Sequence, residues 1–242
     1  MDRPHLVIIG AGLCGSILAA RLRDRFAVTV VEPHRSARPL FNEIECSAGG
    51  VNSSINRGSG LGGTTNYWHN ALVELDHGDL AAAGLDPAGM RPWYDAAWRM
   101  FLDDDQLREV RGVAAHQREA ALATALQGSL AHMAVPTRRV NAWHLADERF
   151  PGSPIRMINA RASRVRRDGD GIIVELEPGA EVTELRADRV VIAAGGLGTP
   201  VLLARSLERF DSVCGGYHDH PMAYVAKIRL RPDSGLRELS GV

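Results

Sequence analysis

The stretch LVIIGAGLCGSILAARL, residues 6–22, constrains the fold more than any other part of this 242-residue chain. It opens with an apolar, β-branched run typical of a buried parallel strand. Three glycines, Gly10, Gly12 and Gly15, then follow at G-x-G-x-x-G spacing and lead into a helical pattern. A second β-branched run, AVTVVE, ends at Glu32. This order of strand, glycine turn, helix and strand predicts a βαβ unit that binds a dinucleotide.

Each of these residues has a physical role in such a unit. Gly10 allows the tight turn, Gly12 lets the backbone approach a pyrophosphate, and Gly15 lets helix and strand pack closely. The helix then presents free N–H groups and the positive end of its dipole to the phosphates. Glu32 can accept hydrogen bonds from both hydroxyls of a ribose, and its charge disfavours NADP. The alternative, an ordinary glycine turn with a solvated Glu32, leaves the complete order of elements unexplained, while the spacing alone does not separate FAD from NAD.

A second glycine cluster, RGSGLGGTTNYWHN, occupies residues 57–70 and has four glycines in six residues. Glycine-rich backbone permits unusual angles and a close approach to a ligand. Thr64, Thr65 and Asn66 can offer hydroxyl and amide groups to a polar ring edge. The alternative is a flexible surface loop, against which the aromatic pair that follows argues. The cluster therefore favours FAD over NAD, which does not need it.

A third informative segment covers residues 156–207. The alternating runs GIIVELE and EVTELRA are separated by Pro178 and Gly179, a pattern that predicts a hairpin. RVVIAAGG is another buried-strand pattern that ends in small residues. A helix is expected to begin near Thr199 and Pro200, because proline suits the first helical turn.

Composition narrows the classes of function. Twenty-eight basic against 29 acidic residues give a formal charge of −1, so neither nucleic acid nor an anionic membrane surface is an expected partner. Cys14, Cys46 and Cys214 lack CxxC spacing, so we expect no disulfide framework and no metal site. A reducing, cytoplasmic location is the expectation. Asp2 and the early glycines argue against a signal peptide, and no apolar run of about 18 residues predicts a membrane span.

These segments, in this order, resemble the glucose–methanol–choline family of FAD-dependent oxidoreductases. The resemblance rests on the first fingerprint and on RGSGLGGTTNYW, NARASRV, VVIAAGGLGTPVLLARS and HDHP. It covers most of residues 5–231 except 76–150, and GLGGTTNYWHNA is most similar to the sugar-oxidising branch of pyranose oxidases and sugar or sugar-acid dehydrogenases. The resemblance implies an α/β fold: a Rossmann-like FAD-binding domain whose parallel sheet has a β-meander crossover, a helical insertion, and the start of a substrate-domain sheet.

The resemblance also implies a set of cofactor-binding residues. Some relatives tether the flavin through a His where this chain has Tyr67, and His69 does not inherit that role, so FAD is expected to bind non-covalently. The implied contacts are the pyrophosphate at Gly10, Gly12 and Gly15; the adenosine ribose at Glu32; the cofactor's side at Arg57 and Gly58; the flavin at Gly62, Gly63, Thr64, Thr65 and Asn66; adenine at Ala162; the adenosine side at Ala194 and Gly195; and the cofactor's surroundings at Asp219 and His220.

The middle of the chain is expected to be helical over residues 89–132, with Trp93, Trp98 and Phe101 in its core. The expected domains are an FAD-binding domain over 1–75 and 155–221, a helical insertion over 76–154, and the first strand of an incomplete substrate domain over 222–242.

In the family, a His in the second half of the protein takes the hydroxyl proton while hydride passes from the alcohol carbon to the flavin. That half also supplies a final cofactor motif, and neither has a counterpart here, so no catalytic residue is assigned. We expect an uncovered strand edge, which a second polypeptide, a symmetric copy of this chain or further residues of the same chain would cover. A second polypeptide is the expected source of this half. The chain is thus expected to be the FAD-binding component of a heteromeric oxidoreductase acting on an alcohol or a sugar hydroxyl. The alternatives are a non-catalytic nucleotide-binding scaffold and a small NAD-dependent enzyme.

Overall fold

The computed structural model describes residues 3–34, 38–48, 51–68, 72–75, 77–111, 133–134 and 140–209, and the side chains of all of these except 38–57, 110–111 and 133–134. The chain divides into two compact units. The first comprises residues 1–69 and 139–217, and the second residues 70–138 and 218–242. The expected division at residues 75/76 and 154/155 differs from this one, since residues 139–154 belong to the first unit. The expected strand within 222–242 lies outside the described residues.

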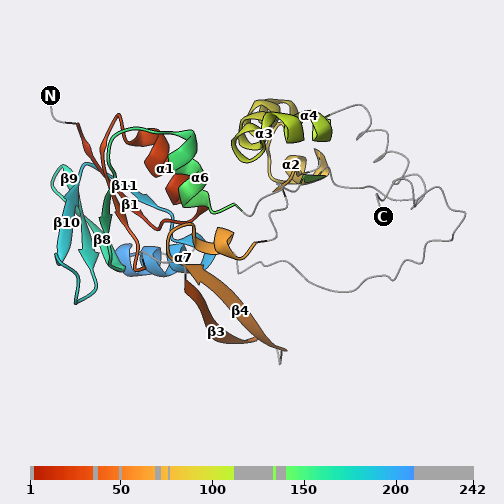
Figure 1. Cartoon of the computed structure of the whole chain (residues 1–242). Coiled ribbons are helices and arrows are strands. Elements are labelled where there is room, and N and C mark those ends of the chain that lie inside the picture. The colour runs from red at the N-terminus through yellow and green to blue at the C-terminus, as the bar shows by residue number, and fades with distance from the viewer. Residues whose placement is uncertain are drawn as a thin grey trace, which may run out of the picture. The chain divides into compact units, whose positions relative to one another are not determined.

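The first unit is built on a parallel sheet of four strands in the order β11-β1-β2-β7 (Figure 1). The β1–β2 pair was expected, and the register sets Ile9 beside Val31. On its other side β1 pairs with β11, the strand expected from RVVIAAGG. The bounds are β1 (His5–Ile9), β2 (Ala27–Val31), β7 (Arg156–Ile158) and β11 (Arg189–Ile192).

Both faces of this sheet are covered, because its apolar residues alternate between two cores. Leu6 and Ile8 pack on one side with α1 (Leu13–Leu22), whereas Val7 and Ile9 pack on the other. All four are almost fully buried. Burial on both faces explains why the strand is continuously apolar instead of alternating.

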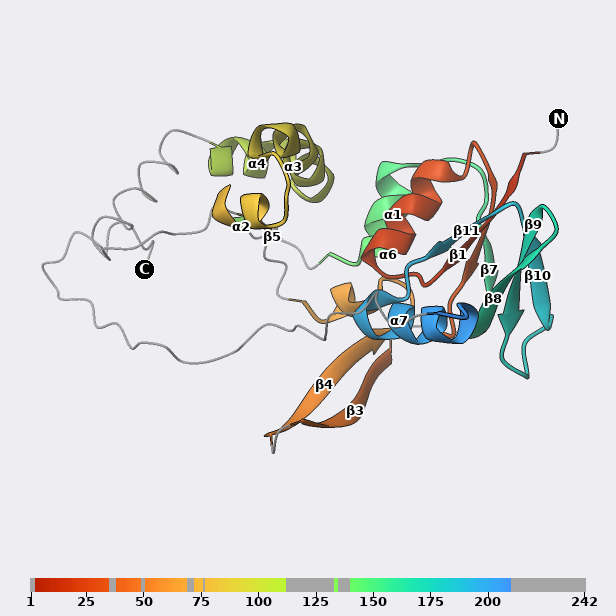
Figure 2. The ribbon, with the colours of Figure 1, turned by 180° about the vertical axis from the view of Figure 1, so that it is seen from behind.

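A second helix, α6 (Ala142–Arg149), lies beside α1 on the same face (Figures 1 and 2). Trp143 packs against the core that contains Ile8. The Arg23 guanidinium, at the end of α1, donates to the Asp147 carboxylate at 2.7 Å and holds the two helices together.

The opposite face carries an antiparallel meander, β8 (Ala162–Asp168), β9 (Gly171–Leu176) and β10 (Glu184–Ala187), together with α7 (Gly195–Ser206), seen from behind in Figure 2. The expected hairpin is therefore confirmed, as is the crossover that the resemblance implied. The predicted start of the last helix is wrong, because α7 begins at Gly195 and contains Pro200. Proline has no N–H, so Pro200 leaves the Gly196 carbonyl without a donor from within the helix. Gly196 is exposed, so water can donate to this carbonyl.

A long hairpin, β3 (Arg38–Ala48) and β4 (Val51–Ser59), extends from this unit (Figure 1). Nothing in the sequence predicted it. Its second strand leads directly into the turn of the second glycine cluster, which ends in a short 3₁₀ helix, η1 (Gly63–Asn66).

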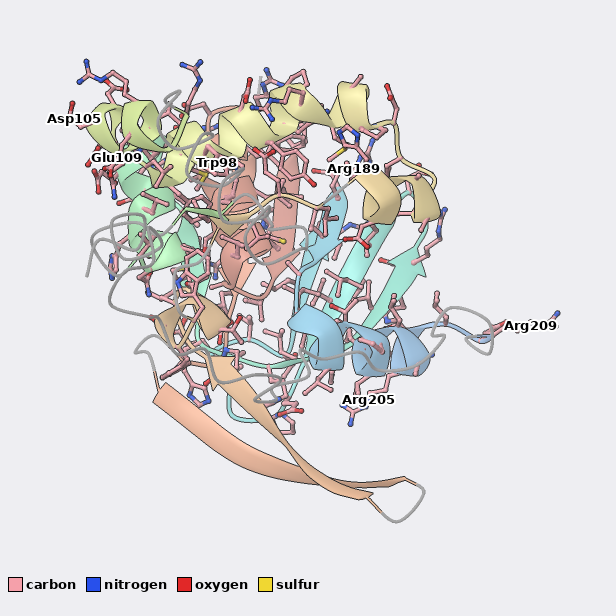
Figure 3. All side chains as sticks on the ribbon, turned by 90° about the vertical axis from the view of Figure 1, so that its right-hand side faces the viewer. Trp98, Asp105, Glu109, Arg189, Arg205 and Arg209 are labelled. Carbon is pink, nitrogen blue, oxygen red and sulfur yellow. The ribbon has the colours of Figure 1, made fainter. Side chains whose placement is uncertain are left out.

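The second unit contains α2 (His77–Ala82), α3 (Pro87–Phe101), α4 (Asp104–Arg111) and the paired strands β5 (Leu72–Val73) and β6 (Met133–Ala134). Trp98 is buried, as expected, and packs with Leu102. Asp105 and Glu109 of α4 point outward (Figure 3). The prediction for Trp93 is wrong: it is 66% exposed, because the apolar stripe of α3 runs through Trp98 instead. The rest of the predicted helical segment, 112–132, lies outside the described residues.

Candidate functional site

The carboxyl ends of β11, β1 and β2 meet at one edge of the sheet and bring three chain segments together. Gly10 N–H donates to the Val31 carbonyl at 2.9 Å, and Ala193 N–H donates to the Ile9 carbonyl at 2.8 Å. Gly10 therefore lies between the ends of its two neighbouring strands. In open parallel sheets this edge is where ligands bind.

Two glycines of the first glycine loop, residues 10–15, are required by the protein itself. Gly10 has φ +102°, and a Cβ there would lie 2.4 Å from the Ala193 carbonyl oxygen. A Cβ on Gly15 would lie 2.0 Å from the Gly10 carbonyl oxygen. These contacts bear out the tight turn and the close helix packing expected from the sequence.

Gly12 differs from both. It has φ −71° and ψ −168°, a conformation open to any residue, and caps the N-terminus of α1. A Cβ built on it would meet no atom within 4 Å among the described residues. The packing of the described residues therefore gives no reason for glycine at this position, whereas a ligand lying against the helix N-terminus would.

The second glycine loop, residues 60–66, is docked on the first. Gly62 N–H donates to the Ala11 carbonyl at 2.8 Å. A Cβ on Gly63 would lie 2.9 Å from the Gly12 Cα, so the two backbones are in contact. Gly62 and Gly63 have φ of +91° and +54°. The two glycine clusters of the sequence thus form one continuous backbone surface.

The polar side chains of the second loop are used within the protein. Thr65 is buried, and its hydroxyl donates to the Gly62 carbonyl and accepts from Ala142 N–H. The Asn66 amide nitrogen donates to the carbonyls of Leu61 and Gly63. Thr64 is exposed. Thr65 and Asn66 therefore shape the loop, whatever they contribute to a ligand.

Asn141 is a residue of this site that the sequence reasoning missed. Its Oδ1 caps α6 by accepting from Trp143 N–H and His144 N–H. Its Nδ2 donates to the Leu61 carbonyl at 2.9 Å and to Asn66 Oδ1 at 2.5 Å. Asparagine before a helical run signals an N-cap, so the cap could have been found, but no sequence signal reveals the contact with a loop 80 residues away.

Glu32 lies where β2 ends and is only 7% exposed. Its Oε2 accepts from Ala11 N–H and its Oε1 accepts from Gly60 N–H, each at 3.0 Å. A carboxylate has about four acceptor positions, so two remain for a ribose.

Ser59 supplies a buried polar atom that none of the described residues uses. The residue is 8% exposed, and its Oγ has no hydrogen-bond partner in the part of the chain that the structure describes. An unpaired buried hydroxyl is unfavourable. Its neighbour Gly60 is bonded to Glu32, so this hydroxyl lies close in the chain to the carboxylate expected to bind a ribose.

The remaining expected contacts are distributed as follows. Gly58 packs on η1, where a Cβ would lie 2.9 Å from Thr64 Cα. Ala162 begins β8, and Ala194 and Gly195 form the N-terminus of α7, where a Cβ on Gly195 would meet nothing within 4 Å. The Arg57 side chain, Asp219 and His220 lie outside the described residues.

The described residues contain no group of three or more His, Cys, Asp or Glu side chains placed to hold a metal ion. None of the described helices combines the length and the apolar character needed to cross a membrane.

The geometry thus suits an elongated ligand with an anionic centre. The first N–H groups of α1 have no acceptor within the helix and lie beside Gly12, where a Cβ would meet none of the described residues. Helix N-termini bind phosphates. Glu32 and Ser59 supply an acceptor and a hydroxyl nearby in the fold. A dinucleotide has phosphates at its centre and hydroxylated riboses on either side, so the residues present fit it.

Known structures share the fold of this chain. Matches include pyridoxine 4-oxidase from Mesorbium loti (22% identity, TM-score 0.55, 84% of this chain and 52% of that one). A fungal aryl-alcohol oxidase also matches, with 15% identity and a TM-score of 0.57, over 85% of this chain and 48% of that one. An FAD-dependent oxidoreductase from Chaetomium thermophilum matches with 18% identity and a TM-score of 0.53, over 83% of this chain and 47% of that one. These solved proteins are glucose–methanol–choline oxidoreductases, so the fold implied by the sequence resemblance is confirmed.

The chain spans about half the length of the solved structures that it matches. No protein-family model matches it, and no curated protein shows significant similarity to it.

Proposed function

We propose that this chain is the FAD-binding component of an oxidoreductase. Gly12 is the observation that carries the proposal: the described residues leave space at the N-terminus of α1 where they would tolerate a side chain. The match to a solved FAD-dependent oxidoreductase supports FAD over NAD. The second glycine loop, docked beside this space, also favours the larger flavin cofactor.

The residues divide the binding of FAD among them. The N–H groups at the start of α1 would hold the pyrophosphate beside Gly12. Glu32 would accept from the adenosine ribose with its two remaining acceptor positions, and Ser59 would complete the contacts around it. The backbone of Gly62 and Gly63 would lie along the flavin. FAD, when bound, supplies a ring that accepts hydride, and we expect it to be held without a covalent bond because Tyr67 takes the place of a tethering His.

The substrate side of the reaction belongs to the finer part of the proposal. The match covers about half of each matched structure, and one of these proteins is named for oxidising aryl alcohols. We infer that a second polypeptide supplies the substrate domain together with the His base that takes the hydroxyl proton. The substrate would be an alcohol or a sugar-like hydroxyl, and the complex would work in the cytoplasm.

The cofactor claim is tested by the visible spectrum of the purified chain and by the mass of any nucleotide released on denaturation. We expect flavin absorption bands and the mass of FAD. A colourless chain that also fails to bind added FAD, or one that releases NAD, overturns the proposal.

Two glycine variants make this test specific. Gly12→Ala should change the unfolding free energy by less than about 1 kcal/mol, because the added methyl meets no atom of the described residues and alanine is only a weaker cap. It should nevertheless weaken FAD binding by about tenfold, which equals about 1.4 kcal/mol. Gly15→Ala is the contrast, because its methyl would collide with the Gly10 carbonyl and destabilise the fold itself by about 3 kcal/mol. If Gly12→Ala binds FAD like the wild type, the space at Gly12 is not the pyrophosphate site.

The catalytic claim needs a separate experiment. The chain is purified with co-expressed products of neighbouring genes, and reduction of its flavin by alcohols and sugars is followed anaerobically. Bleaching of the flavin bands only in the presence of a second polypeptide supports the two-chain oxidoreductase. Retained FAD with no bleaching under any combination favours a scaffold that binds the nucleotide without catalysis.

A further inference from the structure

The Glu32 carboxylate bridges two loops that are far apart in the sequence. One oxygen accepts from Ala11 N–H in the first glycine loop, and the other accepts from Gly60 N–H at the start of the second, both at 3.0 Å. The side chain is only 7% exposed, so water competes little for these bonds. Hydrogen bonds to an ionised acceptor are stronger than neutral ones.

The bridge lies beside the contact between the two loops. The Ala11 carbonyl accepts from Gly62 N–H at 2.8 Å, so both polar backbone groups of Ala11 are used in joining the two loops. Gly62 and Gly63 have positive φ, a conformation that glycine adopts readily. The carboxylate, at the end of β2, fixes the residue that leads into this turn by accepting from Gly60 N–H.

We propose that Glu32 is a positioning residue that holds the second glycine loop against the first, in addition to any contact it makes with ribose. The positioning role rests on the proposed function only in one respect, namely that the assembled loops serve to bind FAD. The two roles are compatible because the two N–H groups use half of the acceptor positions of a carboxylate. The cofactor would then meet a surface that is already assembled.

The two roles predict different results for a variant without cofactor. Glu32→Gln has one oxygen acceptor and one NH₂ donor, so it can satisfy only one of the two N–H groups and turns a donor toward the other. If Glu32 served only the ribose, this substitution would leave the loops of the cofactor-free protein unchanged. If it positions the loops, at least one amide loses its partner before any cofactor binds.

The experiment is amide hydrogen exchange on the cofactor-free full chain, read at Ala11 and Gly60. In Glu32→Gln we expect at least one of these amides to exchange about tenfold faster or more than in the wild type. The amides of Val7 and Ile8 in β1 serve as the internal reference for weakening of the whole fold, and the loop amides must accelerate beyond them. Glu177→Gln, which alters a half-exposed partner of Arg161, is the matched control and should leave Ala11 and Gly60 unchanged.

Glu32→Asp provides the second variant, and it is measured in the same way if Glu32→Gln does not fold. It keeps the charge but is one methylene shorter, so we expect it to protect one of the two amides and to recover part of the FAD affinity lost in Glu32→Gln. Wild-type rates at both amides in both variants would overturn the proposal. A wild-type protein that binds no FAD would overturn the proposed function, yet the exchange result for Glu32 would stand on its own.

Discussion

The Nδ2 of Asn141 donates to the Leu61 carbonyl at 2.9 Å, while its Oδ1 accepts from the first N–H groups of α6. One amide therefore caps a helix and holds the second glycine loop. The adjacent Ala142 N–H, donated to the Thr65 hydroxyl at 3.0 Å, strengthens the same junction. The start of α6 is thus a support for the loop proposed to line the flavin.

Asn141→Asp separates these two tasks. A carboxylate keeps the cap, and its charge suits the positive end of the helix. It has no donor, however, and places negative oxygens against the Leu61 carbonyl and Asn66 Oδ1. We expect helix content to be preserved and FAD affinity to fall by about tenfold, measured by circular dichroism and by fluorescence titration with FAD.

The control for this variant is the cap of another helix. Asp86 caps α3 by accepting from Ala88 N–H and Gly89 N–H. Asp86→Ala should cost about 1 kcal/mol of stability and leave FAD affinity unchanged. Equal loss of FAD affinity in both variants would mean that helix stability, not the Asn141–Leu61 contact, controls binding.

We expect substitutions of Arg23 and of its partner Asp147 to lower the free energy of unfolding by different amounts. Its side chain is 6% exposed and donates to Asp147 and to the Phe150 carbonyl, whereas Asp147 is 63% exposed. Arg23→Ala removes buried bonds and packing between α1 and α6 and should cost about 3 kcal/mol in urea unfolding. Asp147→Asn should cost less than about 1 kcal/mol, because an exposed partner adds little. Similar losses in both variants would contradict this division.

The sequence could predict what depends on local pattern. Gly10, Gly15 and the two strands around them follow from spacing and apolar runs, and their contacts came out as expected. The β9–β10 hairpin likewise follows from alternation and from the turn at Gly179. These features are local because strand, turn and helix are determined within a few residues of one another.

Local pattern could not predict contacts across the chain. Glu32 was expected to bind a ribose, and no pattern reveals that its carboxylate also meets Gly60. Thr65 was expected beside the flavin, and no pattern reveals that its hydroxyl accepts from Ala142 N–H at the start of α6. Polar side chains such as these have several possible partners, and tertiary packing decides between them.

Asp24 makes stability depend on pH in a known direction. The Ser153 N–H donates to its carboxylate at 2.9 Å, and this bond, followed by that of the Ser153 hydroxyl and the charges of Arg23 and Arg3, lowers the pKa of Asp24 below its usual 3.8. A lowered folded-state pKa contributes stability above pH 3.8, and that stability is lost as the pH falls through the folded value.

The wild type should therefore lose stability more steeply than Asp24→Asn as the pH is lowered from about 5 to about 3. Urea midpoints measured across this range provide the comparison. Ser153→Ala removes the hydroxyl but keeps the N–H, so its profile should lie between the two. Parallel profiles for the wild type and Asp24→Asn would show that this carboxylate does not contribute.

Ser59 tests whether the buried polar groups at this edge of the sheet serve a ligand. Its Oγ is buried and has no partner among the described residues. Ser59→Ala should leave the cofactor-free chain as stable as the wild type, or more stable by about 1 kcal/mol, because an unpaired hydroxyl is removed. FAD affinity should fall by about fivefold to tenfold, the value of one hydrogen bond.

Ser206→Ala is the control and should do the reverse, since the Ser206 hydroxyl accepts from Val165 N–H and donates to the Leu202 carbonyl. It should destabilise the fold without changing FAD affinity. If Ser59→Ala instead destabilises the cofactor-free chain and leaves FAD binding intact, the hydroxyl belongs to the fold and not to the site.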